Sequence, residues 1–267
     1  MALLSLESVS LTYPGDERPA VANLSLTINQ GEFWAVVGPS GSGKSSTIGL
    51  LAGLTPATSG QITLDDKPIL TPGPDRAVVF QDYSLFPWMT ALENIVFTLQ
   101  ETGQAVGNAA KQQAEQLLEL VGLKSYSRKY PSELSGGMRQ RVAIARAFAQ
   151  DSPIYLMDEP FGAVDAKTRV ILQDLLLKLW LGSGTKKTIF LVTHDIDEAL
   201  YLADHIAVFT PGPGRVGKVI DIPFERPRRR FFLVQHPQYI ELRNEILSLL
   251  QKEIIEELQQ VEGGAGI

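Results

Sequence analysis

The chain has 267 residues, of which 44% are hydrophobic and 20% charged, and it contains no cysteine. Such a chain is typical of a soluble globular protein with one large domain, or one domain with a smaller annex. The lack of cysteine excludes disulfides, thiolate zinc sites and cysteine nucleophiles, and favours a reducing cytoplasm. With 24 basic and 30 acidic residues, the net charge of −6 gives no sign of a nucleic-acid-binding protein.

The N-terminal segment, MALLSLESVS, lacks the basic start and long apolar core of a secretory signal. No stretch approaches the roughly 18 consecutive apolar residues of a membrane-spanning helix. The best apolar runs, Phe33–Val37 and Ile189–Thr193, are short and indicate buried strands. If the protein acts at a membrane, we expect a partner to supply the membrane part.

The predicted elements of the first half begin with strand-like alternation over residues 4–28. A buried strand over Phe33–Val37 is followed by a Gly/Ser-rich loop and a helix through Leu54. Short strands are predicted over Ile62–Leu64 and Ala77–Phe80.

The composition turns helical from about residue 85 to 150, and we expect this insert to form a lobe of its own. After it, two further strands, Ile154–Met157 and Thr188–Val192, are separated by a helix over Ala166–Trp180. Strands that alternate with helices predict an α/β core with parallel strands.

The pattern changes near Pro223, and we predict one large domain over residues 1–225 and a C-terminal extension over 226–267. An arginine-rich joint, PFERPRRRFF, leads into an amphipathic helix with apolar residues four apart, at Leu242, Ile246, Leu250, Ile254 and Leu258. The arginines could bind anionic lipid headgroups or a regulatory anion. A solvated joint is the favoured interpretation of Arg226, Arg228, Arg229 and Arg230.

A phosphate-binding loop pattern, G-x(4)-G-K-[ST], follows the buried strand and precedes the helix, as this motif requires. Backbone amides and the helix N-terminus would surround the phosphates, Lys44 would reach the β- and γ-phosphates, and the Ser45 hydroxyl would bind Mg²⁺. The predicted nucleotide contacts are Gly38, Pro39, Ser40, Gly41, Ser42, Gly43, Lys44, Ser45 and Ser46.

Two carboxylates end the apolar strand Ile154-Tyr-Leu-Met-Asp158-Glu159. By itself this pattern would fit a solvated acidic turn. Beside a phosphate loop it predicts that Asp158 holds the Mg²⁺ shell and that Glu159 polarises the water that attacks the γ-phosphate. We therefore expect the chain to hydrolyse ATP.

The segment Leu134-Ser135-Gly136-Gly137-Met138 matches the LSGGQ signature of ABC ATPases, with Met138 in place of Gln. From about residue 4 to 224, the chain resembles the nucleotide-binding subunit of an ABC transporter. The resemblance implies a P-loop NTPase core with an N-terminal antiparallel β subdomain and an inserted helical subdomain. It also implies that Ser135, Gly136 and Gly137 face the ATP held by a second, identical or homologous, ATPase subunit.

The resemblance assigns four further residues. Tyr13 would stack on adenine, Gln81 would sense Mg²⁺ and water, and Asp165 would lie in a loop at the dimer interface. His194 would contact the γ-phosphate as the switch histidine. The other two histidines are interpreted as structural, namely His205 and His236.

A single phosphate loop without a long insert favours a transporter subunit over the alternative, a soluble ABC ATPase acting on nucleic acid or ribosomes. In the transporter family, the aromatic segment Asp82–Asn94 would form the groove that receives the permease, although core packing would also explain its aromatic residues. Since no membrane segment is visible, we expect a separate permease and, indirectly, an extracytoplasmic binding protein. The expected location is the cytoplasmic face of the bacterial cell membrane.

A finer resemblance is to the nitrate/sulfonate/taurine/bicarbonate importer group. It rests on Phe86-Pro-Trp-Met-Thr, Met157-Asp-Glu-Pro-Phe-Gly-Ala, Pro213-Gly-Arg215, His236-Pro and Leu242-Arg-Asn-Glu-Ile. Nitrate or bicarbonate is the first choice of cargo, and an alkanesulfonate or taurine the second. The expected cofactors are ATP and Mg²⁺, with no nucleic acid as partner.

Overall fold

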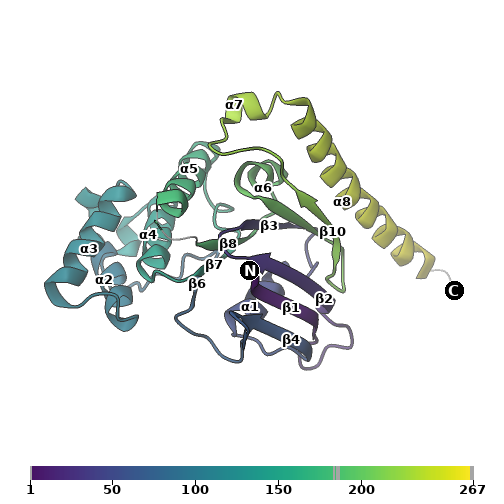
Figure 1. The fold of residues 1–267 in the computed structure, drawn as a ribbon, viewed down its shortest axis with the longest axis horizontal. Helices are drawn as coiled ribbons and strands as arrows, with labels where there is room; N and C mark the ends of the chain where they lie inside the picture. Colours follow the sequence, from purple (N-terminus) through teal and green to yellow (C-terminus); the bar gives the residue numbers. More distant parts are fainter. Residues whose placement is uncertain (1, 183, 185–186, 265–267) are drawn as a thin grey trace. The chain divides into compact units, whose positions relative to one another are not determined.

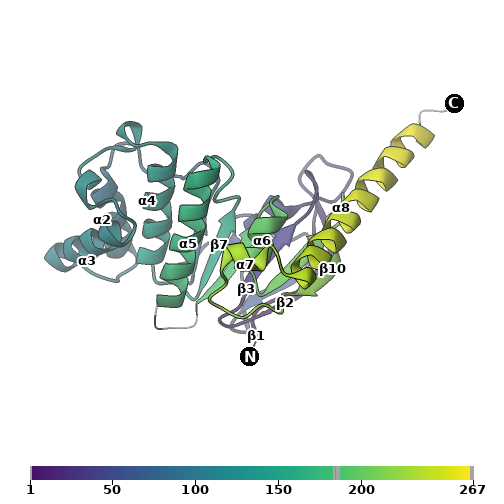
Figure 2. The same cartoon turned by 90° about the horizontal axis from the view of Figure 1, so that it is seen from above.

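The computed structural model describes the backbone of residues 2–182, 184 and 187–264, and the side chains of residues 3–182, 184 and 187–251. Two compact units make up the chain. The first combines residues 1–72 with 188–267, and the second spans Gly73–Lys187. Figure 1 and Figure 2 show the elements of each unit in two views.

The first unit contains an antiparallel sheet in the order β2-β1-β4-β5. Leu6 pairs with Leu26 across the two long strands, and both side chains are buried. Alternate residues of β2 are buried, as expected for a sheet with one face in the core. The strands are β1 (Ala2–Leu11), β2 (Val21–Asn29), β4 (Ser59–Leu64) and β5 (Lys67–Pro68).

A second set of strands in the same unit is centred on β3 (Phe33–Val37), all of whose residues are buried. It pairs in parallel with β8 (Thr188–Val192) and with β9 (His205–Phe209), and β10 (Val216–Asp221) pairs antiparallel with β9. The helices of this unit are α1 (Lys44–Ala52), α6 (Ile196–Leu202), α7 (Arg230–Leu233) and α8 (Pro237–Gly264).

The second unit is mainly helical around a parallel strand pair, in which Val79 of β6 lies opposite Met157 of β7. The strands are β6 (Arg76–Val79) and β7 (Ile154–Asp158). The α-helices are α2 (Ala91–Glu101), α3 (Gly107–Leu120), α4 (Gly136–Ala149) and α5 (Ala166–Gly182). Two 3₁₀ turns, η1 (Lys124–Tyr126) and η2 (Pro131–Glu133), precede α4.

The α/β class is confirmed, and the expected helical insert lies within the second unit. The helix after the phosphate loop ends at Ala52 and not at Leu54, because Gly53 turns left-handed with φ of 71°. The predicted tail helix corresponds to α8, in which Ile246 is fully buried; the side chains of Ile254 and Leu258 lie outside the described residues. A domain boundary at residue 225 stays a prediction.

The interpretation of the arginine joint as solvated is wrong for most of its residues. Arg228 is only 8% exposed, and Arg226 and Arg230 are half-buried, whereas Arg229 is exposed. Arg226 donates to the Asp204 carboxylate and Arg228 to the Ala203 carbonyl, and these hydrogen bonds offset the loss of hydration of the two guanidinium groups. No helix in the described part of the chain has both the length and the apolar character to span a membrane.

Candidate active site

The phosphate loop of the first unit joins β3 to α1, so that a rigid buried strand and a helix N-terminus fix its two ends. Lys44 is 8% exposed, and its Nζ donates hydrogen bonds to the carbonyl oxygens of Gly38 and Pro39 at 2.9 and 2.7 Å. The ammonium group is therefore held inside its own loop. This position fits a cation that neutralises phosphate oxygens.

Glycine is required at two points of this loop for steric reasons. Gly43 has φ of 78°, and a Cβ there would lie 2.6 Å from the carbonyl oxygen of Ala20. A Cβ at Gly38 would lie 2.7 Å from the Ser42 Oγ. The backbone is thus free to turn closely around an anion at the start of α1, which is the geometry that a nucleotide phosphate requires.

Tyr13, predicted to stack on adenine, is brought to the same place as the phosphate loop. Its hydroxyl donates to the Ser46 Oγ at 3.2 Å, although the two residues are far apart in the sequence. The tyrosine side chain is 37% exposed, so its ring remains open to a ligand.

His194 follows β8 and lies at the same edge of the sheet as the phosphate loop. Val192 of β8 pairs with Val36 of β3, and the Thr193 amide donates to the Val36 carbonyl at 3.0 Å. The next residue, Asp195, caps α6 by accepting from the Glu198 amide at 3.0 Å. The backbone of His194 is therefore held on one side by the Thr193–Val36 hydrogen bond and on the other by the Asp195 cap, and its side chain is exposed.

The second unit places Gln81 and the two carboxylates at one edge of the β6–β7 pair. Gln81 comes two residues after β6, and Asp158 ends β7, which runs parallel to it. Glu159 has φ of 45°, in the left-handed region that non-glycine residues rarely adopt, and its carbonyl accepts from the Gly162 amide at 3.1 Å. Such strain is typical of a functional turn.

The signature segment forms the start of α4. Ser135 is the N-cap, and its Oγ accepts from the Met138 amide at 3.3 Å. Gly137 allows α4 to approach α5 closely, because a Cβ there would lie 2.5 Å from the Thr168 methyl carbon. Gly136 lies beside it in the first turn, where the free amides of a helix favour an anion.

Asp165 caps the next helix, α5. Its carboxylate accepts from the Thr168 amide at 3.0 Å and from the Thr168 hydroxyl at 2.6 Å. These hydrogen bonds lower the pKa of Asp165. The carboxylate is exposed and ionised, so a contact with another chain remains open to it.

A groove of about 270 Å³ in the second unit is lined by Ser84 and Phe86 of the segment Asp82–Asn94, together with Phe97 and Arg146. Phe86 packs on Phe97 with ring centroids 5.1 Å apart and on Trp88 at 5.6 Å, and Trp88 is 68% exposed. Arg146 lies over the Phe86 ring at 5.5 Å and donates to the Ser84 carbonyl at 2.7 Å. Arg146 was not predicted from the sequence, because nothing in its own segment singles it out.

The candidate residues divide between the units. The first unit holds Tyr13, the whole loop and His194, and the second holds Gln81, Ser135, Gly136, Gly137, Asp158, Glu159 and Asp165. Within each unit, the residues at the ends of neighbouring parallel strands share an edge. The glycine cradle and Lys44 fit a nucleotide, and hydroxyl and carboxylate oxygens are the donors that Mg²⁺ prefers.

Comparison with known proteins shows the family to which the chain belongs. Residues 21–162 match the family described as ABC transporter. The chain is 45% identical to the nitrate import ATP-binding protein NrtD of Synechococcus elongatus, covering 93% of this chain and 92% of the relative. It is 44% identical to the bicarbonate transport ATP-binding protein CmpD of Synechocystis, with coverages of 93% and 89%. It is 43% identical to the taurine import ATP-binding protein TauB of Chromobacterium violaceum, with coverages of 93% and 95%.

Among solved structures, the dimeric ATP-binding cassette MJ0796, in a post-hydrolysis state bound to ADP and phosphate, has a TM-score of 0.74 to this chain. The identity is 33%, and the match covers 84% of this chain and all of that one. This chain combines a phosphate loop, a pair of carboxylates and a capped signature helix, and it is similar over most of its length to these relatives. The chain therefore belongs to the ABC transporter family, as one of its ATP-hydrolysing cassettes.

Proposed function

We propose that this protein is the ATP-hydrolysing subunit of an importer for a small anion, with nitrate or bicarbonate as the first choice and an alkanesulfonate or taurine as the second. The observation that carries the proposal is the likeness to nitrate, bicarbonate and taurine import proteins over 93% of the chain. An ATPase of this kind acts at the cytoplasmic face of a membrane through a permease that contacts the cargo.

In the proposed mechanism, the protein positions a water for in-line attack on the γ-phosphate of bound ATP. Glu159 accepts the water's proton, and His194 holds the γ-phosphate in place. Lys44 neutralises charge that develops on the phosphate oxygens. Ser45, Gln81 and Asp158 would hold Mg²⁺, whose charge would further neutralise the phosphate oxygens.

The proposed site is completed by a second ATPase subunit. Ser135, Gly136 and Gly137 begin α4 with free helix amides, a second anion-binding end that would face the partner's nucleotide. Asp165 would cross the interface beside it. Two identical or homologous chains would thus form two complete sites, and closure of the dimer on ATP would be the motion that drives transport.

The proposed permease contact is the groove that contains Phe86 and Arg146. The exposed Trp88, whose ring packs on Phe86, and the half-buried guanidinium of Arg146 in the groove wall suit a short amphipathic helix of a partner. Burial lowers the pKa of Arg146, which nevertheless stays charged at neutral pH. Gln81, two residues after β6, would connect this groove to the Mg²⁺ site.

The experiment is ATP hydrolysis by the chain co-expressed with the permease genes adjacent to its own, with and without Glu159→Gln. We expect permease-dependent activity that one anion stimulates, and a loss of about 10²- to 10⁴-fold in the variant because the general base is gone. Nitrate, bicarbonate, taurine and an alkanesulfonate are supplied separately with the binding protein, and the stimulating anion names the cargo.

A Trp88→Ala chain serves as the coupling variant. Its activity with the permease should fall to the permease-independent rate. Activity that ignores the permease, or that nucleic acid or ribosomes stimulate, would instead favour a soluble ABC ATPase and overturn the transport proposal.

A further inference from the structure

The helix α6 begins two residues after His194 and has only seven residues. A helix of this length is not stable by itself, so tertiary contacts determine where it lies. Its apolar side chains Ala199, Leu200 and Leu202 are fully buried in the first unit. Besides the Asp195 cap at its start, the C-terminal extension adds polar contacts at both ends of the helix.

The first turn of α6 is held through Asp197. One carboxylate oxygen, Oδ1, accepts from the Tyr239 hydroxyl at 2.8 Å and from the Arg243 Nε at 2.8 Å, and both donors belong to α8. Tyr239 is 3% exposed, and burial followed by the hydrogen bond to Asp197 raises its pKa. The phenol therefore remains a protonated donor across the physiological range.

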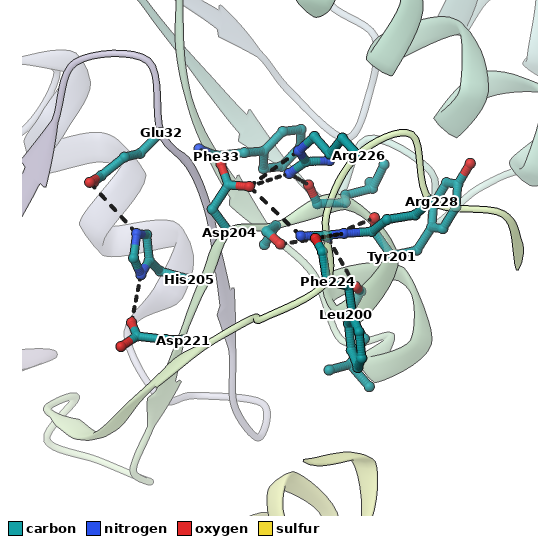
Figure 3. Close-up of polar contacts among 12 residues, drawn as sticks. Glu32, Phe33, Leu200, Tyr201, Asp204, His205, Asp221, Phe224, Arg226 and Arg228 are labelled. Atoms are coloured by element: carbon teal, nitrogen blue, oxygen red, sulfur yellow. Dashed lines mark hydrogen bonds and ion pairs between the residues drawn. The ribbon is translucent and has the colours of Figure 1, made fainter. Parts of the chain in front are cut away.

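The last turn of α6 is held by the arginine joint (Figure 3). Arg228 Nη1 donates to the carbonyl oxygens of Leu200, Tyr201 and Ala203 at 3.1, 3.0 and 2.7 Å. Arg226 Nη2 donates to the Leu202 carbonyl at 2.5 Å. These are the carbonyls that a helix leaves without partners at its C-terminus, so the joint replaces a missing C-cap.

We propose that the C-terminal extension positions the switch histidine: α8 and the arginine joint hold α6 at both ends and thereby fix the backbone that carries His194. In this scheme Tyr239 and Arg243 are positioning residues that act through Asp197. The inference rests on the proposed function, since His194 affects the rate only if the chain hydrolyses ATP in the way proposed.

The chain supplies a matched control on the same helix. Glu245, on α8, forms an ion pair with Lys218 of β10. Its loss would loosen α8 where it contacts β10 and leave the contacts to Asp197 in place. A comparison of the Glu245 and Arg243 variants therefore separates general loosening of α8 from loss of the contact with α6.

The kinetic test compares Tyr239→Phe and Arg243→Gln with Glu245→Gln in the full chain assembled with its permease. We expect kcat to fall about tenfold in the first two, because a small displacement of a reacting group is costly, with little change in KM for ATP. Glu245→Gln should keep the original kcat, and Arg243→Lys, which retains a cationic donor, should recover part of the loss. Equal kcat values in all variants would overturn the proposal.

A double-mutant cycle identifies the route of the effect. In a His194→Ala background, Arg243→Gln should cause no further loss of kcat, since the histidine it positions is absent. Losses that add would mean that Arg243 acts elsewhere and would sink the inference. A His194→Ala chain with full activity would overturn both the inference and the role of His194, while the ATPase assignment would stand.

Hydrogen exchange supplies a readout that does not depend on ATP hydrolysis. The amides of residues 193–202 should exchange faster in Tyr239→Phe and Arg243→Gln than in the original chain, and Glu245→Gln should leave them unchanged. Unchanged exchange in this segment would show that the extension does not hold α6. The positioning proposal would then fail even if the chain proved to be an active importer ATPase.

Discussion

Two glycines of the phosphate loop share a backbone conformation but differ in their surroundings. Gly41 has φ of 80° with no atom within 4 Å of where a Cβ would lie, whereas a Cβ at Gly43, φ 78°, would lie 2.6 Å from the Ala20 carbonyl oxygen. Conformational strain therefore applies to both positions, and a steric clash to one. A comparison of Gly41 with Gly43 therefore distinguishes the cost of a positive φ from the cost of a steric clash.

Alanine substitutions at the two positions should differ in their cost. Gly41→Ala should lower the free energy of unfolding by about 1–2 kcal/mol, the cost of a left-handed residue with a Cβ. Gly43→Ala should lower it by about 2–4 kcal/mol and weaken nucleotide binding, since the loop must also move away from Ala20. Urea denaturation and titration with a fluorescent ATP analogue provide the measurements, and equal costs would contradict the steric explanation.

At the scale of elements, helix ends account for several of the polar contacts. In α2 the Thr90 hydroxyl accepts from the Glu93 amide at 3.2 Å, and the Glu93 carboxylate accepts from the Thr90 amide at 2.7 Å. This capping box starts the helix within the segment Asp82–Asn94, directly after its aromatic residues. The hydrogen bond from the Thr90 backbone, above all, lowers the pKa of Glu93 from its ordinary value of 4.5.

The sign of the Glu93 shift predicts a pH dependence. Since its folded-state pKa lies below the unfolded one, its contribution is present above about pH 4.5 and is lost as the pH falls through the folded-state pKa. The difference in unfolding free energy between the original chain and Glu93→Gln should therefore shrink between pH 7 and pH 3.5. Urea denaturation at the two pH values checks this, and a difference that grows toward acid would refute it.

The arginine joint offers a second prediction at this scale. Burial lowers the pKa of Arg228 to about 10, and its guanidinium serves the carbonyls at the end of α6. Arg228→Ala should lower the free energy of unfolding by about 2–4 kcal/mol, because it leaves buried acceptors without donors. Its exposed neighbour is the control: Arg229→Ala should stay within about 0.5 kcal/mol. Similar losses in both variants, measured by chemical denaturation, would contradict the capping role.

At the scale of the whole molecule, the division of the candidate residues between two units is the main feature. The first unit holds the phosphate loop and His194, and the second holds Glu159 and the signature helix. The proposed function adds a second subunit to complete the site.

This arrangement predicts dimerisation that depends on ATP. Glu159→Gln should bind ATP without hydrolysing it, so that the closed state accumulates and the mass measured by light scattering doubles when ATP is added. Adding Ser135→Arg to this variant should prevent the doubling, because a long cationic side chain would occupy the anion-binding end of α4. A double variant that still dimerises with ATP would count against the role of Ser135 at the interface.

Part of the proposed site could be predicted because the residues concerned are close together in the sequence. The phosphate loop places its glycines, Lys44 and Ser45 within eight consecutive residues, and the Asp158–Glu159 pair directly follows an apolar strand. The parallel α/β core followed from alternating strand and helix patterns. The strands β9 and β10 and the helix α6 were not predicted by residue range, because short segments are defined by the sheet they join.

Other features were decided only by the tertiary structure. Asp197 and Tyr239 are hydrogen-bonded although they lie 42 residues apart in the sequence, and Arg146 and Ser84 are 62 residues apart. No local sequence pattern predicts either contact. The arginine-rich joint has the composition of a solvated linker, yet Arg228 is buried because the end of α6 presents carbonyls to it. The sequence by itself determined the nucleotide chemistry, since that chemistry needs neighbouring residues in a fixed order. The tertiary structure decided how the C-terminal extension meets α6, since hydrogen bonds between distant segments exist only once the chain has folded.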